Sequence, residues 1–421
     1  MRFLAAPHGI ALAHVTRALE VAKALRARGH DVIFACSGRY GRILEREGFE
    51  HCPVITETPE KALARVKQGK RYADDDRMLA AYVEDECRVM REVGPDAVLG
   101  DLRPTLGIST ELMQLPYIAI TNACFTRYYA AAHPPPETVP LTRWLGKRLS
   151  ARLMPGLRKM MLSRMAAPFR RYREEHDLAP VATMMEVLES PVMNLIADVP
   201  EFAPTRNLPG HFRYVGPLVW NPTLPVPPWL ERLPEGRRKV YVTLGSTGGG
   251  RPVTEAIIRA LSTLDVEVMI VGDCPAVDDR RRARFHWAPY APGRILAERA
   301  DLVICHGGSG TIYQALSAGR PLLCLPTFVE QEIHADRVVA CGVGLKICPS
   351  RLSPRTVRAA CEELLDNPRY TEAALDMKNI VSEWDGPATA ASLIEIVTRG
   401  HGYARPGRSA ATPPMVESAH D

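Results

Sequence analysis

The sequence lacks the features of several common protein classes. None of its 421 residues lie in a run approaching the ~20 apolar residues of a membrane-spanning helix. The N-terminal stretch MRFLAAPHGIALAHV is interrupted by Pro7, His8 and His14 and has no basic segment ahead of a long apolar core. It therefore predicts a first strand and not a signal peptide. The ten cysteines form no C-x-x-C pair, so we expect reduced thiols in a cytoplasmic protein and no metal-ligand spacing.

Two widespread phosphate-binding motifs are also missing. No glycine-rich stretch ends in Gly-Lys-Ser or Gly-Lys-Thr, and the glycines do not fit G-x-G-x-x-G. The formal net charge of +5 is mild, and it does not by itself indicate nucleic-acid binding.

Strand-like and helix-like segments alternate in both halves of the chain. In the first half, apolar runs at 3–6, 32–35, 97–100 and 117–120 predict strands, and the apolar spacing over 15–28 predicts a helix that stops at Gly29. The alternation restarts with strands predicted at 240–244, 266–271, 302–305 and 321–325. This pattern predicts an α/β protein with parallel sheets and helices on both faces.

The chain length predicts two domains, each large enough for its own core. We place the first at 1–215 and the second at 237–373, joined by a proline-dense linker at 216–236. One or two helices are predicted over 374–400, and a disordered tail rich in Gly, Pro, Ser and Ala is predicted over 401–421.

A glycine-rich turn follows the strand predicted at 302–305. The residues are His306, Gly307, Gly308, Ser309, Gly310 and Thr311, and a helix follows to residue 318. Unpaired N–H groups and the helix dipole make such a turn an anion site, most often for phosphate, and glycine permits close approach. Gly245, Ser246 and Thr247 follow the strand at 240–244 and can add donors, or they form a flexible turn.

The segment from Trp287 to Gln331 resembles the donor-binding signature of family-one nucleotide-sugar glycosyltransferases (UDP-glycosyltransferase-like, GT-B fold). Trp287-Ala288-Pro289 matches the W-A-P opening of the plant form. After a one-residue insertion, His306 falls at the phosphate-contacting histidine, and Glu330-Gln331 falls at the Asp-Gln pair that holds the sugar hydroxyls. The resemblance implies two facing Rossmann-like domains, with the last helix crossing back onto the first.

The resemblance also implies roles on the donor side. Trp287 stacks on a nucleobase, or it is a core tryptophan. Thr311 caps its helix, binds phosphate, or does both, and His306 hydrogen-bonds a phosphate and, if protonated, pairs with it. Gln314 replaces the ribose-binding Glu of the plant form, and Glu330 is one methylene longer than the family's Asp. A UDP-sugar co-substrate is expected, dTDP stays open, and no cofactor is implied.

His14 falls on the family's catalytic histidine, and Asp101 ends the P-D-x-x-x-x-D pattern that supplies its partner. In this reading His14 deprotonates an acceptor hydroxyl and Asp101 fixes the imidazole; His8 is the rival base. The reaction is a single displacement with inversion. The helix N-terminus and His306 counter the leaving charge, so no metal is required. The run Asp74-Asp75-Asp76 superficially resembles a metal-binding D-x-D, but we interpret it as a solvated loop.

Acceptor information is sparse between residues 55 and 208. Residues 141–173 contain ten Lys or Arg and no Asp or Glu, interleaved with apolar residues. This predicts a basic amphipathic helix pair interrupted at Pro155. It either packs on the core with a solvated basic face or docks on an anionic membrane. We therefore expect a small hydrophobic or lipid acceptor, with possible peripheral association at the inner face of a membrane.

A second class of function stays open. The same fold serves nucleotide-sugar epimerases and could serve a non-catalytic nucleotide-sugar-binding module. Epimerases use paired carboxylates around the sugar, and a binding module would not need His14, so the His14 and Asp101 pair favours transfer.

Overall fold

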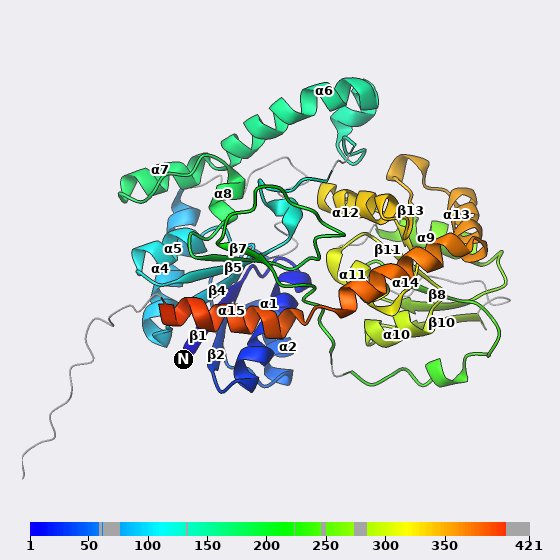
Figure 1. Cartoon of the computed structure of the whole chain (residues 1–421), viewed down its shortest axis with the longest axis horizontal. Coiled ribbons are helices and arrows are strands. Elements are labelled where there is room, and N and C mark those ends of the chain that lie inside the picture. Colours follow the sequence, from blue (N-terminus) through cyan, green and yellow to red (C-terminus); the bar gives the residue numbers. More distant parts are fainter. Residues whose placement is uncertain are drawn as a thin grey trace, which may run out of the picture.

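The computed structural model describes residues 1–58, 61, 76–131, 134–222, 224–245, 250–272 and 284–400. They form two parallel β-sheets, of seven and six strands, with helices on both faces (Figure 1). The predicted α/β class is therefore confirmed. Ser246, Thr247 and the tail at 401–421 lie outside the described residues.

The first sheet has the strand order β3-β2-β1-β4-β5-β6-β7. Its central strands are buried on both faces, as in β4 and β5, which explains why they appear in the sequence as continuous apolar runs. The strands are β1 (Arg2–Pro7), β2 (Asp31–Ala35), β3 (His51–Cys52), β4 (Ala97–Asp101), β5 (Tyr117–Thr121), β6 (Met193–Ile196) and β7 (Phe212–Tyr214). The helices of this half are α1 (Leu12–Ala27), α2 (Gly41–Arg46), α4 (Asp76–Val93), α5 (Leu106–Leu112), α6 (Pro140–Met165), α7 (Ala167–Glu175) and α8 (Met184–Leu188).

The second sheet has the order β10-β9-β8-β11-β12-β13. Its strands are β8 (Lys239–Thr243), β9 (Glu267–Val271), β10 (Phe285–Ala288), β11 (Leu302–Cys305), β12 (Leu322–Cys324) and β13 (Gly344–Lys346). Its helices are α9 (Gly250–Leu261), α10 (Gly293–Arg299), α11 (Ser309–Ala318), α12 (Val329–Ala340), α13 (Pro354–Asp366) and α14 (Pro368–Ser382).

The last helix, α15 (Gly386–Gly400), leaves the second sheet and lies along the first half of the molecule (Figure 1). Ala390, Ala391 and Ile394 belong to the same buried cluster as the apolar face of α1. Glu395 of α15 bonds to His30 at 2.5 Å and to Arg28 at 3.2 Å. The predicted return of the C-terminal helix is therefore confirmed.

The interruption predicted at Pro155 is wrong. Pro155 lies within α6, and the non-helical residue is Gly146, with φ 74° and ψ 162°. The proline is tolerated because the carbonyl that it leaves unpaired belongs to exposed Ala151, which water can reach. The glycine supplies a backbone conformation that other residues adopt only with strain.

Much of α6 is not covered by the rest of the protein. Trp144 is 89% exposed, and Leu149, Leu153, Met160 and Met161 are each about half exposed. Thr142 and Ser150 of α6 are nevertheless buried, and near the end of the helix Leu162 and Met165 pack against a buried cluster. The core-facing interpretation therefore holds for parts of α6 and not for its whole length. No helix of the described residues is long and apolar enough to cross a bilayer.

Candidate active site between the two sheets

Both sheets reverse their strand order at one point, between β1 and β4 in the first and between β8 and β11 in the second. Ligands of open α/β sheets bind at the carboxyl ends of the strands at such points. The predicted residues lie there. His14 follows β1, Asp101 ends β4, Gly245 follows β8 and His306 follows β11.

The structure brings His14 and Asp101 together. His14 lies in the first turn of α1, and its Nδ1 is 2.8 Å from Oδ1 of Asp101, whose side chain is fully buried. Because the carboxylate can only accept, Nδ1 carries the proton and Nε2 is the ring nitrogen that can accept one. The rival base His8 is buried beside it, with the two ring centroids 6.5 Å apart, and the backbone N–H of His8 donates to the carbonyl oxygen of Asp101.

Sequence reasoning missed a second partner of Asp101. Arg17, one turn beyond His14 on α1, binds both carboxylate oxygens, with Nε 2.7 Å from Oδ2 and Nη2 2.6 Å from Oδ1. Its Nη1 donates to Asn122, which follows β5. The signal was present, since Arg17 lies three residues after His14 and so shares its face of the helix.

The glycine-rich turn after β11 has the geometry of an anion site. Helix α11 begins at Ser309 with Gly308 as its N-cap, and no side chain caps it. Thr311 therefore lies in the first turn and is not the cap, which corrects one of its two predicted roles. Gly307 has φ 90°, and a Cβ there would lie 2.7 Å from the carbonyl oxygen of Gln331. Only glycine fits this turn without moving α12.

His306 is neutral in this environment. Burial, and secondarily the nearby His334, lower its pKa from 6.5 to about 4. The low pKa favours a hydrogen bond to an anion over the charge pairing that the sequence left open for a protonated His306. Gly245 and Gly308 both pack against its ring. Its Nδ1 is buried and has no hydrogen-bond partner within the described part of the chain, so a hydrogen bond, and not a charge, is what this side chain offers an anion.

The other predicted donor residues lie on β10, α11 and α12. Trp287 on β10 is 40% exposed, and its Nε1 donates to the carbonyl of Gly272 at 2.6 Å, which fixes the indole. The amide of Gln314 packs against Gly293, where a Cβ would meet it at 2.6 Å. Gln331 is buried, and its Oε1 accepts from the backbone N–H of Thr327 at 2.9 Å, whereas the neighbouring Glu330 is partly exposed.

The two halves of the site contact each other. Tyr313 of α11 donates to Asp198, which follows β6, at 3.0 Å and packs edge-on against Phe202. Cys124 Sγ and His334 Nε2 are 3.5 Å apart across the same boundary. These contacts place the glycine-rich turn and the His14–Asp101 pair on facing sides of one region.

Comparison with known proteins agrees with this architecture. Residues 255–396 match the family described as "Erythromycin biosynthesis protein CIII-like, C-terminal domain". The chain is 33% identical over 374 residues to the "PGL/p-HBAD biosynthesis glycosyltransferase" of Mycobacterium tuberculosis H37Ra, covering 89% of this chain and 87% of the relative. This chain belongs to the nucleotide-sugar glycosyltransferases.

Other relatives lie in the same family of glycosyltransferases. The "PGL/p-HBAD biosynthesis rhamnosyltransferase" of Mycobacterium bovis BCG is 34% identical over 374 residues, with 89% of this chain and 82% of that protein covered. Among solved structures, the glycotransferase of kitacinnamycin aligns with TM-score 0.72 at 21% identity over 94% of this chain and 98% of its own. A spinosyn rhamnosyltransferase complexed with thymidine diphosphate aligns with TM-score 0.68 at 18% identity over 94% and 100%. These alignments confirm the GT-B fold.

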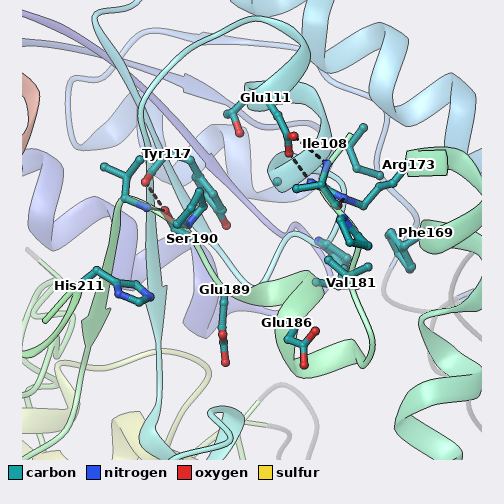
Figure 2. A pocket seen from close by; sticks show the side chains of 18 of the residues that line it. Ile108, Glu111, Tyr117, Phe169, Arg173, Val181, Glu186, Glu189, Ser190 and His211 are labelled. Atoms are coloured by element: carbon teal, nitrogen blue, oxygen red, sulfur yellow. Dashed lines mark hydrogen bonds and ion pairs between the residues drawn. The ribbon is translucent and has the colours of Figure 1, made fainter. Parts of the chain in front are cut away.

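The glycosyltransferase has a cavity of about 660 Å³ in its first half (Figure 2). It lies near the amino ends of strands of the first sheet, since Tyr117 begins β5 and Val192 precedes β6. Its charged residues are paired with one another, as in Arg173 with Glu111 and Arg127 with Glu189. None of the residues that line it is a predicted donor or catalytic residue, so it is separate from the candidate site.

Proposed function

We propose that this glycosyltransferase transfers a sugar, with inversion, from a nucleoside diphosphate sugar to a hydroxyl of a hydrophobic or lipid acceptor. The observation that carries the proposal is the hydrogen bond between partly buried His14 and fully buried Asp101, 2.8 Å apart, at the carboxyl end of one sheet. Across from it lie the glycine-rich turn and the uncapped N-terminus of α11 on the other sheet.

In the proposed reaction, Nε2 of His14 takes the proton of the acceptor hydroxyl. The acceptor oxygen forms a bond to the anomeric carbon as the bond from that carbon to the diphosphate oxygen breaks, and the nucleoside diphosphate leaves from the opposite face. Asp101 stabilises the imidazolium that forms. This arrangement favours transfer over the alternative of an epimerase or a binding module. The His14–Asp101 pair can remove a proton from an acceptor hydroxyl, whereas an epimerase needs groups that act on the sugar ring.

The leaving diphosphate requires counter-charge and hydrogen bonds. We assign these to the N-terminus of α11, the backbone of Gly307 and Gly308, and the imidazole of His306, with Ser246 and Thr247 as further predicted donors. Uncapped N–H groups at a helix start stabilise anions, so turnover is proposed to need no divalent metal.

The donor sugar is proposed from two sources. The sequence favours a UDP-sugar and leaves dTDP open, and the relative named as a rhamnosyltransferase adds a deoxyhexose as a second candidate. Glu330 is proposed to hold the sugar hydroxyls. Because its carboxylate reaches one methylene further than Asp, it is the residue through which the sugar is chosen.

The proposed acceptor is a lipid reached at an anionic membrane. The support is α6, where Trp144 is largely exposed and Leu149, Leu153, Met160 and Met161 are about half exposed. Three basic residues among them, Arg148, Arg152 and Lys159, are also exposed. The names of the mycobacterial relatives place those proteins in PGL and p-HBAD biosynthesis. Apolar and basic residues on one helix suit the boundary between headgroups and acyl chains of an anionic bilayer.

The base is tested by turnover. His14→Ala should lower kcat by roughly 10²–10⁴-fold, the usual contribution of a positioned general base, and should leave nucleoside diphosphate affinity nearly unchanged. His8→Ala is the matched control and should retain most activity. Transfer by His14→Ala at near wild-type rate would remove His14 from the mechanism. Release of nucleoside diphosphate is measured with a panel of UDP- and dTDP-sugars, with and without acceptors. Release that depends on an acceptor indicates transfer and not binding or epimerisation.

The donor site is tested by calorimetry. Nucleoside diphosphate should bind in the presence of a chelator, and His306→Ala should weaken binding. An absolute requirement for Mg²⁺ or Mn²⁺ in both binding and turnover would show that the helix N-terminus is not the main counter-charge.

Membrane docking is tested with anionic liposomes. Binding should fall as salt rises, because each basic residue near the surface contributes about 1 kcal/mol that salt screens. Binding should be lost when four residues of α6 are changed together to Gln: Arg143, Lys147, Arg148 and Arg152. The control removes the same charge elsewhere, at four exposed residues: Arg351, Arg355, Arg358 and Arg369. No association at low ionic strength would refute docking and favour a non-membrane hydrophobic aglycone.

A further inference from the structure

Arg17 is held in the buried core of the site and not on a surface. It is 6% exposed, and its guanidinium forms a fork on the Asp101 carboxylate through two hydrogen bonds of 2.6 and 2.7 Å. Its Nη2 also lies 3.4 Å from Nδ1 of His14. Arg17 therefore contacts both members of the proposed base pair while its third nitrogen reaches away from them, to Asn122.

The chain of contacts continues from Asn122 into the second domain. Asn122 Nδ2 donates to Asp198 Oδ1 at 3.1 Å, and the backbone N–H of Ala123 donates to the other oxygen of Asp198 at 2.7 Å. The hydroxyl of Tyr313 donates to Asp198 at 3.0 Å and accepts from the N–H of Val199 at 3.1 Å. Every side chain from Asp101 to Tyr313 in this series is buried.

Tyr313 belongs to α11, the helix whose N-terminus forms the predicted diphosphate site. The series His14, Asp101, Arg17, Asn122, Asp198 and Tyr313 therefore runs from the acceptor side to the donor side without a break. Buried hydrogen-bonded networks hold their members in fixed positions, and loss of one member leaves others unsatisfied. A displacement of α11 is thus transmitted to the carboxylate that orients His14.

We propose that Arg17 is a positioning residue that fixes Asp101, offsets its charge toward His14 and, through Asn122, Asp198 and Tyr313, couples the base to the donor-binding helix. The proposal rests on the proposed role of His14 as the base. A carboxylate alone beside an imidazole favours the protonated ring, which cannot accept a proton. The Arg17 cation lies beside both groups and opposes that effect.

The charges around His14 come from several elements. Asp101 on β4 and Arg17 on α1 touch it, His8 lies beside its ring, and Asp198 and Glu330 act on Arg17 from further away. Burial opposes the charged form of Arg17, but Asp101, with smaller contributions from Glu330 and Asp198, leaves its pKa raised, so the cation persists. The field at His14 is therefore set mainly by the Asp101–Arg17 pair.

The charge effect is tested by the pH profile of kcat/KM for the acceptor. In Arg17→Gln the Asp101 charge is uncompensated. The midpoint of the rising limb, which reports the base, should therefore move to higher pH by about one unit, the lower end of the pKa shifts that a neighbouring charge causes. Arg17→Lys keeps the charge but loses the fork, so its limb should stay near wild type while kcat falls about tenfold or more. A limb for Arg17→Gln that coincides with the wild-type limb overturns the proposal.

The coupling is tested with Tyr313→Phe, which keeps the ring against Phe202 and removes the hydroxyl. The kcat should fall severalfold while the Kd for nucleoside diphosphate changes less than twofold. Combined with Arg17→Lys, the loss should be several times smaller than the product of the single losses, because both changes break one network. The control is Tyr370→Phe, because Tyr370 is a buried tyrosine of α14 outside the network. Any loss of kcat that it causes should multiply with the loss caused by Arg17→Lys.

If the kcat losses of Tyr313→Phe and Arg17→Lys multiply fully in the double variant, the coupling is overturned. The variants also separate this inference from the proposed function. If His14→Ala retains transfer, His14 is not the base and the proposed mechanism fails. If His14→Ala abolishes transfer but Arg17→Gln leaves the pH limb in place, the mechanism stands and only the role of Arg17 fails.

Discussion

Burial of His306 links the stability of the second domain to pH. Its pKa is about 4 in the folded protein against 6.5 for the free side chain. Between these values the unfolded chain binds a proton that the folded chain does not, so the free energy of unfolding falls as pH falls through this window. The full effect is about 3 kcal/mol, of which about 2 kcal/mol is lost at pH 5, since one pKa unit corresponds to ~1.4 kcal/mol.

The assay is equilibrium urea unfolding, followed by circular dichroism at pH 7.5, 6.5, 5.5 and 5.0. Other groups titrate over this range in every variant, so the relevant quantity is the difference between wild type and His306→Gln, which cannot titrate. This difference should shift by about 2 kcal/mol in favour of the variant between pH 7.5 and 5.0. The control is Ile304→Val on β11, the strand that precedes His306. Its cost of roughly 0.5–1.5 kcal/mol should not depend on pH. If the difference in the free energy of unfolding between wild type and His306→Gln does not change with pH, the burial argument is refuted.

Three further changes probe the donor side. Gly307→Ala should raise the Kd for nucleoside diphosphate by roughly 5- to 150-fold, since positive φ and the contact with Gln331 cost roughly 1–3 kcal/mol. Gly310→Ala, which meets nothing within 4 Å, should bind normally, and equal affinities of the two variants would contradict the turn geometry. Trp287→Ala should weaken nucleotide binding about tenfold, as loss of one base stack costs ~1–3 kcal/mol, and Trp287→Phe should recover most of it in calorimetry. Glu330→Asp should change the ranking of donor sugars in a product assay while nucleoside diphosphate affinity stays constant, and an unchanged ranking would remove Glu330 from sugar selection.

The parallel strands could be predicted from sequence because they are buried on both faces. Runs such as 97–100 and 302–305 are continuously apolar, and the residue after each run lies at the carboxyl end of the sheet. This local rule placed Asp101 and His306 at the carboxyl end of their sheets, and the resemblance to the family supplied their expected roles. The start of α11 was harder, because a helix that begins after two glycines and without a side-chain cap shows no N-cap signal.

The network around Arg17 could not be predicted in the same way. Its members lie at positions 17, 101, 122, 198 and 313, and what joins them is the order of strands β1, β4, β5 and β6 together with the packing of α11 on the first domain. The kink of α6 was misplaced for a different reason. A proline predicts a break, but on an exposed helix water compensates the missing hydrogen bond, and Gly146 bends the chain instead.

The crossing of α15 onto the first domain has a consequence for recombining this enzyme with its relatives. The chain passes between the domains twice, and the two passages touch: Gly216 packs on Trp384, and Gly386 packs on the carbonyl of Pro217. A chimera cut once in the linker would pair the apolar face of α1 with a foreign α15. Two cuts, near 216 and near 385, would exchange the donor half as an internal cassette and leave the acceptor half with its own helix.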